Sequence, residues 1–206
     1  MTPGPSPAPA ERPRTLVIAC GALARELVEL IRREGWDHME IVCLPAIWHN
    51  TPAKIPGGVR DKIRANRGRY DRIFCAYADC GTGGLLDEVL AEEGVERLPG
   101  PHCYATYAGQ AAFEAMHERD PACFYLTDYL VRQFDQLIVE GLGLDRHPEL
   151  QELYFGNYTT LIYLAQSDDP ALDAKAQAAA ERLDLAYRRV RTGYGELDSV
   201  LRESAA

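Results

Sequence analysis

Several features that would assign a function directly are scarce or missing in this sequence. No apolar run approaches the ~20 residues that a membrane-spanning helix requires, and the start, Met1 to Arg14, has no apolar core of a secretion signal. We therefore expect a cytoplasmic protein without a membrane partner. Positive charge is also scarce, because 22 Lys and Arg stand against 31 Asp and Glu. Phosphate binding needs clustered cations, so no nucleic-acid partner is expected.

The short motifs of common cofactor sites are missing as well. The run from Cys80 to Gly84, Cys-Gly-Thr-Gly-Gly, has neither the glycine spacing of a dinucleotide-binding loop nor the Gly-Lys-Ser/Thr of a P-loop. NAD and ATP are therefore not expected. The sequence has no CxxC pair, no internal repeat and no coiled-coil heptads.

Short apolar runs alternate with segments of helical periodicity along most of the chain. Strands that alternate with helices imply right-handed crossovers and a parallel sheet. We predict an α/β fold with a doubly wound, mostly parallel sheet that carries helices on both faces. The expected strands are residues 15–20, 39–44, 71–77, 95–98, 123–127, 159–166 and 187–191, and the expected helices are residues 22–34, 57–66, 85–93, 104–118, 128–142, 171–183 and 195–204.

Length and composition predict one folded unit. Residues 1–13 contain five prolines and little that could pack, so we expect a disordered lead-in. Residues 14–206 are long enough for a single α/β domain with a sizeable core. A two-lobed variant also fits the pattern, with a division near Arg119 to Ala122 and a site in the cleft between the lobes.

Three of the six cysteines are expected to be structural. Without a secretion signal the thiols should be reduced, so a disulfide framework is not expected. Cys43, Cys75 and Cys123 lie inside apolar strand runs, where a free cysteine behaves as a small hydrophobe. We assign these three to the core.

The other three, Cys20, Cys80 and Cys103, lie at the end of a predicted strand or in the loop after one. Loops at the carboxyl ends of parallel strands meet in one crevice, so these thiols could converge. With His49 or His102 as a further ligand, the donor set suits zinc, and three cysteines with one open position suit an iron–sulfur cluster. His102 and Cys103 are neighbours whose side chains usually point apart, so only one of them should face a shared metal. A purely structural role for the three cysteines fits equally well.

Metal-free catalysis with Cys80 as the nucleophile is the alternative, with His49 or His102 as the base. The turn that follows leads into a helix, and its backbone N–H groups could bind an anion and lower the pKa of the thiol. This turn consists of Gly81, Thr82, Gly83 and Gly84. A tight strand-to-helix connection would explain the same glycines without any ligand.

Carboxylates also lie near the ends of the predicted strands. Asp79, Asp128, Asp168 and Asp169 could orient a histidine or act as acid/base groups. For Asp128 and Asp168 we expect the ordinary role of capping a helix.

With these segments in view, the chain resembles the bacterial and archaeal domain-of-unknown-function family sixteen thirty-eight. The resemblance covers residues 15–200 and rests on the segments around Cys20, His49, Cys80 and Cys103 and on residues 163–170. Many relatives have His-Asp-Cys where this chain has His102 directly before Cys103. Members are often encoded near corrinoid-dependent methyltransferases for methylamines or betaines, so the resemblance implies a role in one-carbon metabolism. The chain lacks the Asp-x-His-x-x-Gly run of a corrinoid carrier.

Three functions follow as expectations. The first is a cytoplasmic protein that binds zinc or an iron–sulfur cluster in or beside corrinoid-linked methyl-group metabolism. The second is a metal-free enzyme with a cysteine nucleophile and a small-molecule ligand. The third is a non-catalytic accessory protein that docks on a methyltransferase or corrinoid protein through its acidic surface.

Overall fold

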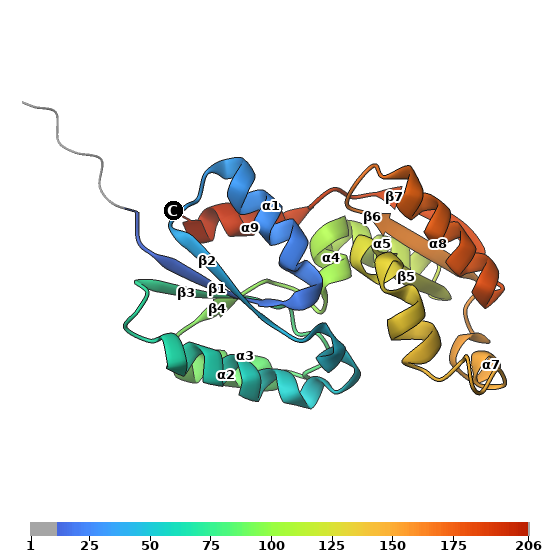
Figure 1. The fold of residues 1–206 in the computed structure, drawn as a ribbon, viewed down its shortest axis with the longest axis horizontal. Helices are drawn as coiled ribbons and strands as arrows, with labels where there is room; N and C mark the ends of the chain where they lie inside the picture. Colours follow the sequence, from blue (N-terminus) through green and yellow to red (C-terminus); the bar gives the residue numbers. More distant parts are fainter. Residues whose placement is uncertain (1–11, 206) are drawn as a thin grey trace, which may run out of the picture.

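The computed structural model describes residues 12–205, which form an α/β fold with two parallel sheets (Figure 1). The first sheet has the order β2-β1-β3-β4 and the second the order β5-β6-β7. The predicted α/β class and the parallel pairing are confirmed, and the strands are divided between two sheets. The strands are β1 (Thr15–Cys20), β2 (Met39–Leu44), β3 (Arg72–Ala76), β4 (Glu96–Arg97), β5 (Cys123–Thr127), β6 (Thr160–Ala165) and β7 (Ala186–Arg191).

Helices follow nearly every strand, as the sequence pattern predicts. None of the helices in residues 12–205 is long and apolar enough to cross a membrane. Short 3-10 turns cover Gly21–Leu23, Ala46–Asn50 and Pro52–Lys54, and a π-helical turn covers Asp135–Glu140. The α-helices are α1 (Ala24–Glu34), α2 (Ile55–Asn66), α3 (Leu85–Glu93), α4 (Cys103–Ala108), α5 (Gln110–Arg119), α6 (Asp128–Arg132), α7 (Leu150–Phe155), α8 (Pro170–Leu183) and α9 (Glu196–Ala205).

Strand β1 is the centre of the first sheet. All six of its residues are buried, which is typical of a parallel strand covered on both faces. It pairs with β2 and β3, so that Cys20 lies opposite Leu44 and Ala19 lies opposite Ala76. The carboxyl ends of these three strands therefore meet at one edge of the sheet, where Tyr77, the residue after β3, comes beside Cys20.

We call the first sheet with α1, α2, α3 and α9 the first lobe, and the second sheet with α5, α6, α7 and α8 the second lobe (Figure 1). The predicted division near residues 119–122 is misplaced, because it falls between α5 and β5, which both belong to the second lobe; the chain leaves the first lobe earlier, at α4. Helix α9 returns to the first lobe, where Leu197 and Leu201 are fully buried and Asp198 pairs with Arg33 at 2.6 Å. Helix α4 contacts both α9 and β6 and thus lies between the lobes. Whether residues 14–206 fold as one domain stays a prediction.

The return to the first lobe depends on Gly195. Its φ is +51°, and a Cβ atom there would lie 2.1 Å from the carbonyl oxygen of Tyr107 in α4. A larger residue would clash with backbone, so glycine is required for α9 to lie against α4.

Several predicted features need correction. The helix expected over residues 104–118 is broken at Gly109, whose φ of 85° interrupts the helical path between α4 and α5. The helix expected over residues 128–142 ends at Arg132 and is followed by the π-helical turn. Helix α7 was not predicted. Cys43 is exposed because β2 is an edge strand, whereas Cys75 and Cys123 are buried as predicted. Residues 1–11 of the predicted lead-in lie outside the described residues.

Candidate thiol site

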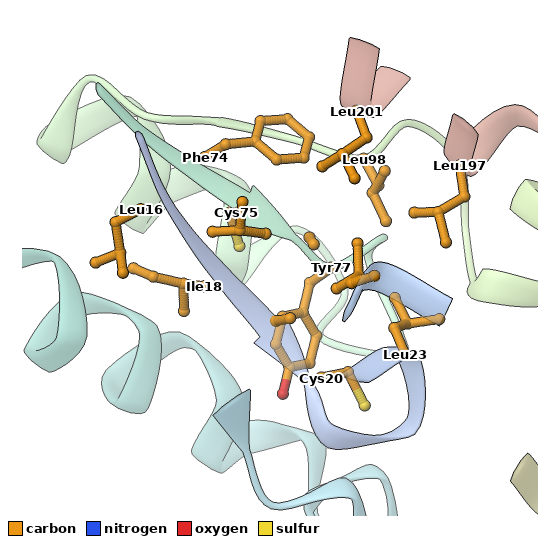
Figure 2. Close-up of a cluster of buried hydrophobic side chains, with 14 of the residues drawn as sticks. Leu16, Ile18, Cys20, Leu23, Phe74, Cys75, Tyr77, Leu98, Leu197 and Leu201 are labelled. Atoms are coloured by element: carbon orange, nitrogen blue, oxygen red, sulfur yellow. The ribbon is translucent and has the colours of Figure 1, made fainter. Parts of the chain in front are cut away.

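Cys20 is the last residue of the central strand, and it also starts the turn into α1. Its sulfur accepts a hydrogen bond from the backbone N–H of Ala22 at 3.3 Å, which caps the 3-10 turn that precedes the helix. Figure 2 shows Cys20 at the end of β1, next to Tyr77 and Leu23 in the buried cluster of the first lobe. The thiol is therefore fixed by the strand register and is only 3% exposed.

Cys80 is held by the segment that follows β4. Its N–H donates to the carbonyl oxygen of Pro101 at 2.8 Å, and the N–H of Asp79 donates to the carbonyl oxygen of Gly100 at 3.1 Å. These bonds bring the start of α4 alongside the Cys80 turn, so that the backbone N–H of Cys103 faces the sulfur of Cys80. Cys80 has a φ of 51°, in the left-handed region that non-glycine residues seldom adopt.

The three thiols lie close enough to influence one another. Burial raises the pKa of Cys20 to about 12 and that of Cys80 to about 11, and it raises the pKa of Cys103 well above its usual range. A charge on Cys80 further raises the pKa of both Cys20 and Cys103, and a charge on Cys20 raises that of Cys103. The topology thus brings the three predicted cysteines into one region. As the structure stands, however, residues 12–205 hold no group of three His, Cys, Asp or Glu side chains placed to bind a metal ion.

The two candidate histidines lie in different surroundings. Nδ1 of His49 lies 3.8 Å from the sulfur of Cys20 and 2.9 Å from the carbonyl oxygen of Ala46. The ring of His102 instead packs against Phe113, with ring centres 4.8 Å apart, and burial lowers its pKa. Of the two, His49 is the histidine beside a thiol.

Tyr77 is a site residue that the sequence analysis did not identify. It is 1% exposed, and within residues 12–205 its hydroxyl has no well-formed hydrogen bond. The hydroxyl faces Cys20, and burial and then the Cys20 thiol raise the pKa of Tyr77. The ring of His49 stacks on Tyr77 with an interplanar angle of 15° and ring centres 6.2 Å apart. The signal in the sequence was its position directly after a buried strand that neighbours β1.

The glycine turn after Cys80 already has an anionic partner within the chain. The carboxylate of Asp79 accepts hydrogen bonds from the N–H groups of Gly83 at 3.2 Å and Gly84 at 2.9 Å, and from the hydroxyl of Thr82 at 2.7 Å. These contacts outweigh burial and hold the pKa of Asp79 below its usual range. Asp79 thus occupies the position that an external anion would take at this turn. The sequence had predicted this anion site at Gly81, Thr82, Gly83 and Gly84.

The expected capping roles of two carboxylates need correction. Thr127, not Asp128, caps α6, because its hydroxyl accepts from the N–H of Leu130 at 3.4 Å. Asp169, not Asp168, caps α8 by accepting from the N–H of Ala171 at 2.9 Å. In both cases the side chain one position away along the chain has the geometry that the cap requires.

The second lobe approaches the thiols. Helix α6 packs against the 3-10 turn after Cys20, and a charge on Cys20 raises the pKa of Tyr129 in α6, after the larger effect of burial. The carboxyl end of β1 and the carboxyl end of β5 therefore face each other. The thiols therefore lie on the side of the first lobe that faces the second lobe.

A family model described as "Protein of unknown function (DUF1638)" matches residues 43–201, more than half of the chain. The chain belongs to this family. The matched range includes His49, Cys80, His102 and Cys103, whereas Cys20 precedes it. No curated protein and no solved structure matches the chain.

Proposed function

We propose that this family member binds a metal ion through the thiolates of Cys20, Cys80 and Cys103, with His49 as the fourth ligand. Three sulfurs and one imidazole nitrogen form a donor set that suits zinc in a tetrahedral site. The observation that carries the proposal is that three separate loops at one edge of the first sheet bring the thiols into one region, where a charge on Cys80 acts on both Cys20 and Cys103.

The charge balance around the thiols favours a cation. Each thiol is neutral at pH 7 because burial raises its pKa. Within residues 12–205, no cationic side chain is among the groups with the largest effects on the pKa of Cys20 or Cys103, and Arg97 only weakly counteracts burial at Cys80. A bound divalent ion would supply the missing positive charge and convert the thiols to thiolates.

The hydrogen bond of His49 suits a metal ligand. A carbonyl oxygen can only accept, so the 2.9 Å contact with Ala46 assigns the ring proton to Nδ1. The lone pair then lies on Nε2. Metal-binding histidines commonly donate their other ring N–H to a backbone carbonyl in this way.

The hydroxyl of Tyr77, which within residues 12–205 has no well-formed hydrogen bond and only the Cys20 thiol beside it, is a second sign of a ligand. A buried hydroxyl without a partner costs about 1–3 kcal/mol, so such groups are rare unless something else binds them. Tyr77 lies beside both Cys20 and the ring of His49. A thiolate at Cys20 would accept a hydrogen bond from this hydroxyl and satisfy it.

Metal binding then requires a local closure, because the donors do not yet form a ligand set. Zinc–sulfur bonds are about 2.3 Å, so the Cys80 turn and the segment before Cys103 must move towards Cys20. Both are loop segments with glycines at positive φ, Gly81 and Gly100, where small backbone changes are least restricted.

The same observations disfavour a free cysteine nucleophile. A reactive thiol needs a lowered pKa, whereas burial raises the pKa of Cys80 to about 11. We retain the setting in or beside corrinoid-linked methyl-group metabolism as part of the proposal, with the family association as its support. A thiolate-bound metal could activate a thiol or methyl group there.

Elemental analysis of anaerobically purified protein tests the proposal. We expect about one equivalent of zinc and no visible colour. Cys103→Ser should lose the zinc, and Cys43→Ser, the matched control on an exposed edge strand, should keep it. A brown chromophore with iron and sulfide would show that the same cysteines hold an iron–sulfur cluster in place of zinc. Wild-type protein that takes up neither metal after supplementation, with its fold confirmed by circular dichroism, would overturn the proposal.

A further inference from the structure

A small cavity lies between the lobes, beside the thiols but formed by different residues. Its volume is about 120 Å³. Arg25 and Glu26 of α1 line it from the first lobe, and Asp128 and Arg132 of α6 and Ser167 after β6 line it from the second. The cavity is therefore built by both lobes and has room for a molecule of a few non-hydrogen atoms.

The carboxylates of the second lobe are occupied within the protein. Asp128 is 1% exposed and accepts hydrogen bonds from the hydroxyl of Tyr163 at 2.7 Å, from the N–H of Gln166 at 2.9 Å and from the hydroxyl of Ser167. Asp169, which also lines the cavity, caps α8. Neither has to bind a ligand to be satisfied.

The guanidinium groups of Arg25 and Arg132 have N–H donors that can bind a ligand. Arg132 lies 3.5 Å from Asp128, at the limit of a hydrogen bond, and its side chain is 24% exposed. Within residues 12–205 Arg25 forms no ion pair, and its neighbour Glu29 instead faces Tyr194, whose pKa burial and then Glu29 raise. Both arginines can therefore present N–H groups to a molecule in the cavity.

Glu26 gives an independent sign of a ligand. It lines the cavity, it is 3% exposed, and its Oε2 has no hydrogen-bond partner within residues 12–205.

We propose that the cavity between the lobes binds a small carboxylate, whose charge is held by Arg25 and Arg132 and which receives a hydrogen bond from Glu26. Guanidinium groups match the two oxygens of a carboxylate in geometry and charge. Burial raises the pKa of Glu26, in keeping with a protonated side chain that donates. The proposal does not depend on a metal at the thiols. A ligand held from both lobes would also stabilise their closed arrangement.

Three probes of similar size and different charge test the proposal. Binding of propionate, propionamide and propylammonium to the full chain is followed by NMR titration of the amide resonances. We expect propionate alone to bind, with shifts at the starts of α1 and α6. Arg132→Gln and Arg25→Gln should each weaken propionate binding at least tenfold. Arg25 is exposed, so its variant should fold even if the other does not.

Glu26→Gln tests whether the cavity binds an anion, held by the arginines, or a cation, held by an ionised Glu26. Glutamine keeps a neutral donor, so propionate should bind this variant within about threefold of wild type. Arg182→Gln, an exposed arginine of α8 outside the cavity, is the control and should bind as wild type does. Three outcomes would each overturn the proposal. The first is binding of propylammonium, and the second is no response to any probe. The third is loss of propionate binding in Glu26→Gln while the arginine variants bind as wild type does.

Discussion

The sulfur of Cys20 lies 3.8 Å from Nδ1 of His49, although 29 positions separate the two residues in the sequence. Cys20 is fixed by the central strand of the first sheet, and His49 lies in the 3-10 turn after the edge strand β2. The parallel pairing of β1 and β2 is what places both at the same edge, since Cys20 is opposite Leu44. The pair is therefore a product of topology. Because Nδ1 carries the ring proton, the contact places His49 beside the thiols, and the ligand atom of the proposed metal site is Nε2.

Replacing His49 should weaken zinc binding without unfolding the protein. His49 is exposed, so His49→Ala removes a ligand and leaves the core intact. We expect a loss of at least tenfold in zinc affinity, measured by competition with a colorimetric chelator. His147→Ala is the matched control, because His147 is also exposed but pairs with Glu149 in a loop of the second lobe. Equal affinities of both variants and the wild type would remove His49 from the ligand set.

Zinc binding should become steeply stronger as the pH rises. The pKa of Cys20 is raised to about 12 and that of Cys80 to about 11, so both are protonated at neutral pH, as is Cys103. Metal binding must release these protons, and each one released makes the association constant rise about tenfold per pH unit. Chelator competition at about pH 6.5 and about pH 7.5 should therefore show a change of well over tenfold. An affinity that is flat over this range would mean that the thiols are not the ligands.

The local pattern of the sequence predicted most elements but not their assembly. The buried strand Thr15–Cys20 and the helix Leu85–Glu93 were predicted with their observed bounds, because apolar runs and helical periodicity are local signals. The division into two sheets depends on which strands pair, and this is decided by tertiary contacts. Cys43 shows the same limit, since an edge strand and a central strand have similar sequences while only the central strand is covered on both faces.

The candidate site could be predicted as a set of loops but not in detail. Strand ends identified Cys20, Cys80 and Cys103 because parallel strands share one edge. The choice between His49 and His102 depends on side-chain direction, which the sequence does not specify. Tyr77 was missed because a tyrosine at the end of an apolar strand looks like any core residue.

The metal-free protein should lose stability above about pH 8.5 because its buried thiols ionise on unfolding. Substitution of Cys75 measures the contribution of one such thiol. Cys75 is fully buried in β3, and burial raises its pKa to about 12. In the unfolded chain a cysteine titrates near ~8.5, so between these values the unfolded state binds fewer protons than the folded state. The free energy of unfolding then falls as the pH rises, by about 1.4 kcal/mol per pH unit for one such thiol.

Urea denaturation at about pH 8 and about pH 10 measures this dependence. Cys75→Ala should lose less stability over that range than the wild type, by about 2 kcal/mol. The comparison uses the change with pH in each protein, because the substitution also leaves a small cavity that lowers stability at every pH. Parallel pH profiles for the two proteins would contradict the prediction.

Two substitutions at Cys80 should differ in stability although both remove the sulfur. The φ of Cys80 is 51°, a conformation that costs an L-residue with a Cβ atom roughly 1–2 kcal/mol and costs glycine little. Cys80→Gly should therefore be about 1 kcal/mol more stable than Cys80→Ala in urea denaturation of the metal-free protein. Both variants should fail to bind zinc, which separates the backbone effect from the chemistry of the thiol.

The same pair of substitutions at Cys75 provides the control. Cys75 lies in a regular strand, where glycine is less stable than alanine by about 0.5–1 kcal/mol, so the order of the two variants should reverse. If alanine is as stable as glycine at position 80, the turn does not hold its left-handed conformation in solution. The hydrogen bond from Cys80 to Pro101 would then not fix the sulfur beside Cys103, and the metal site would lose the geometric basis on which it is proposed.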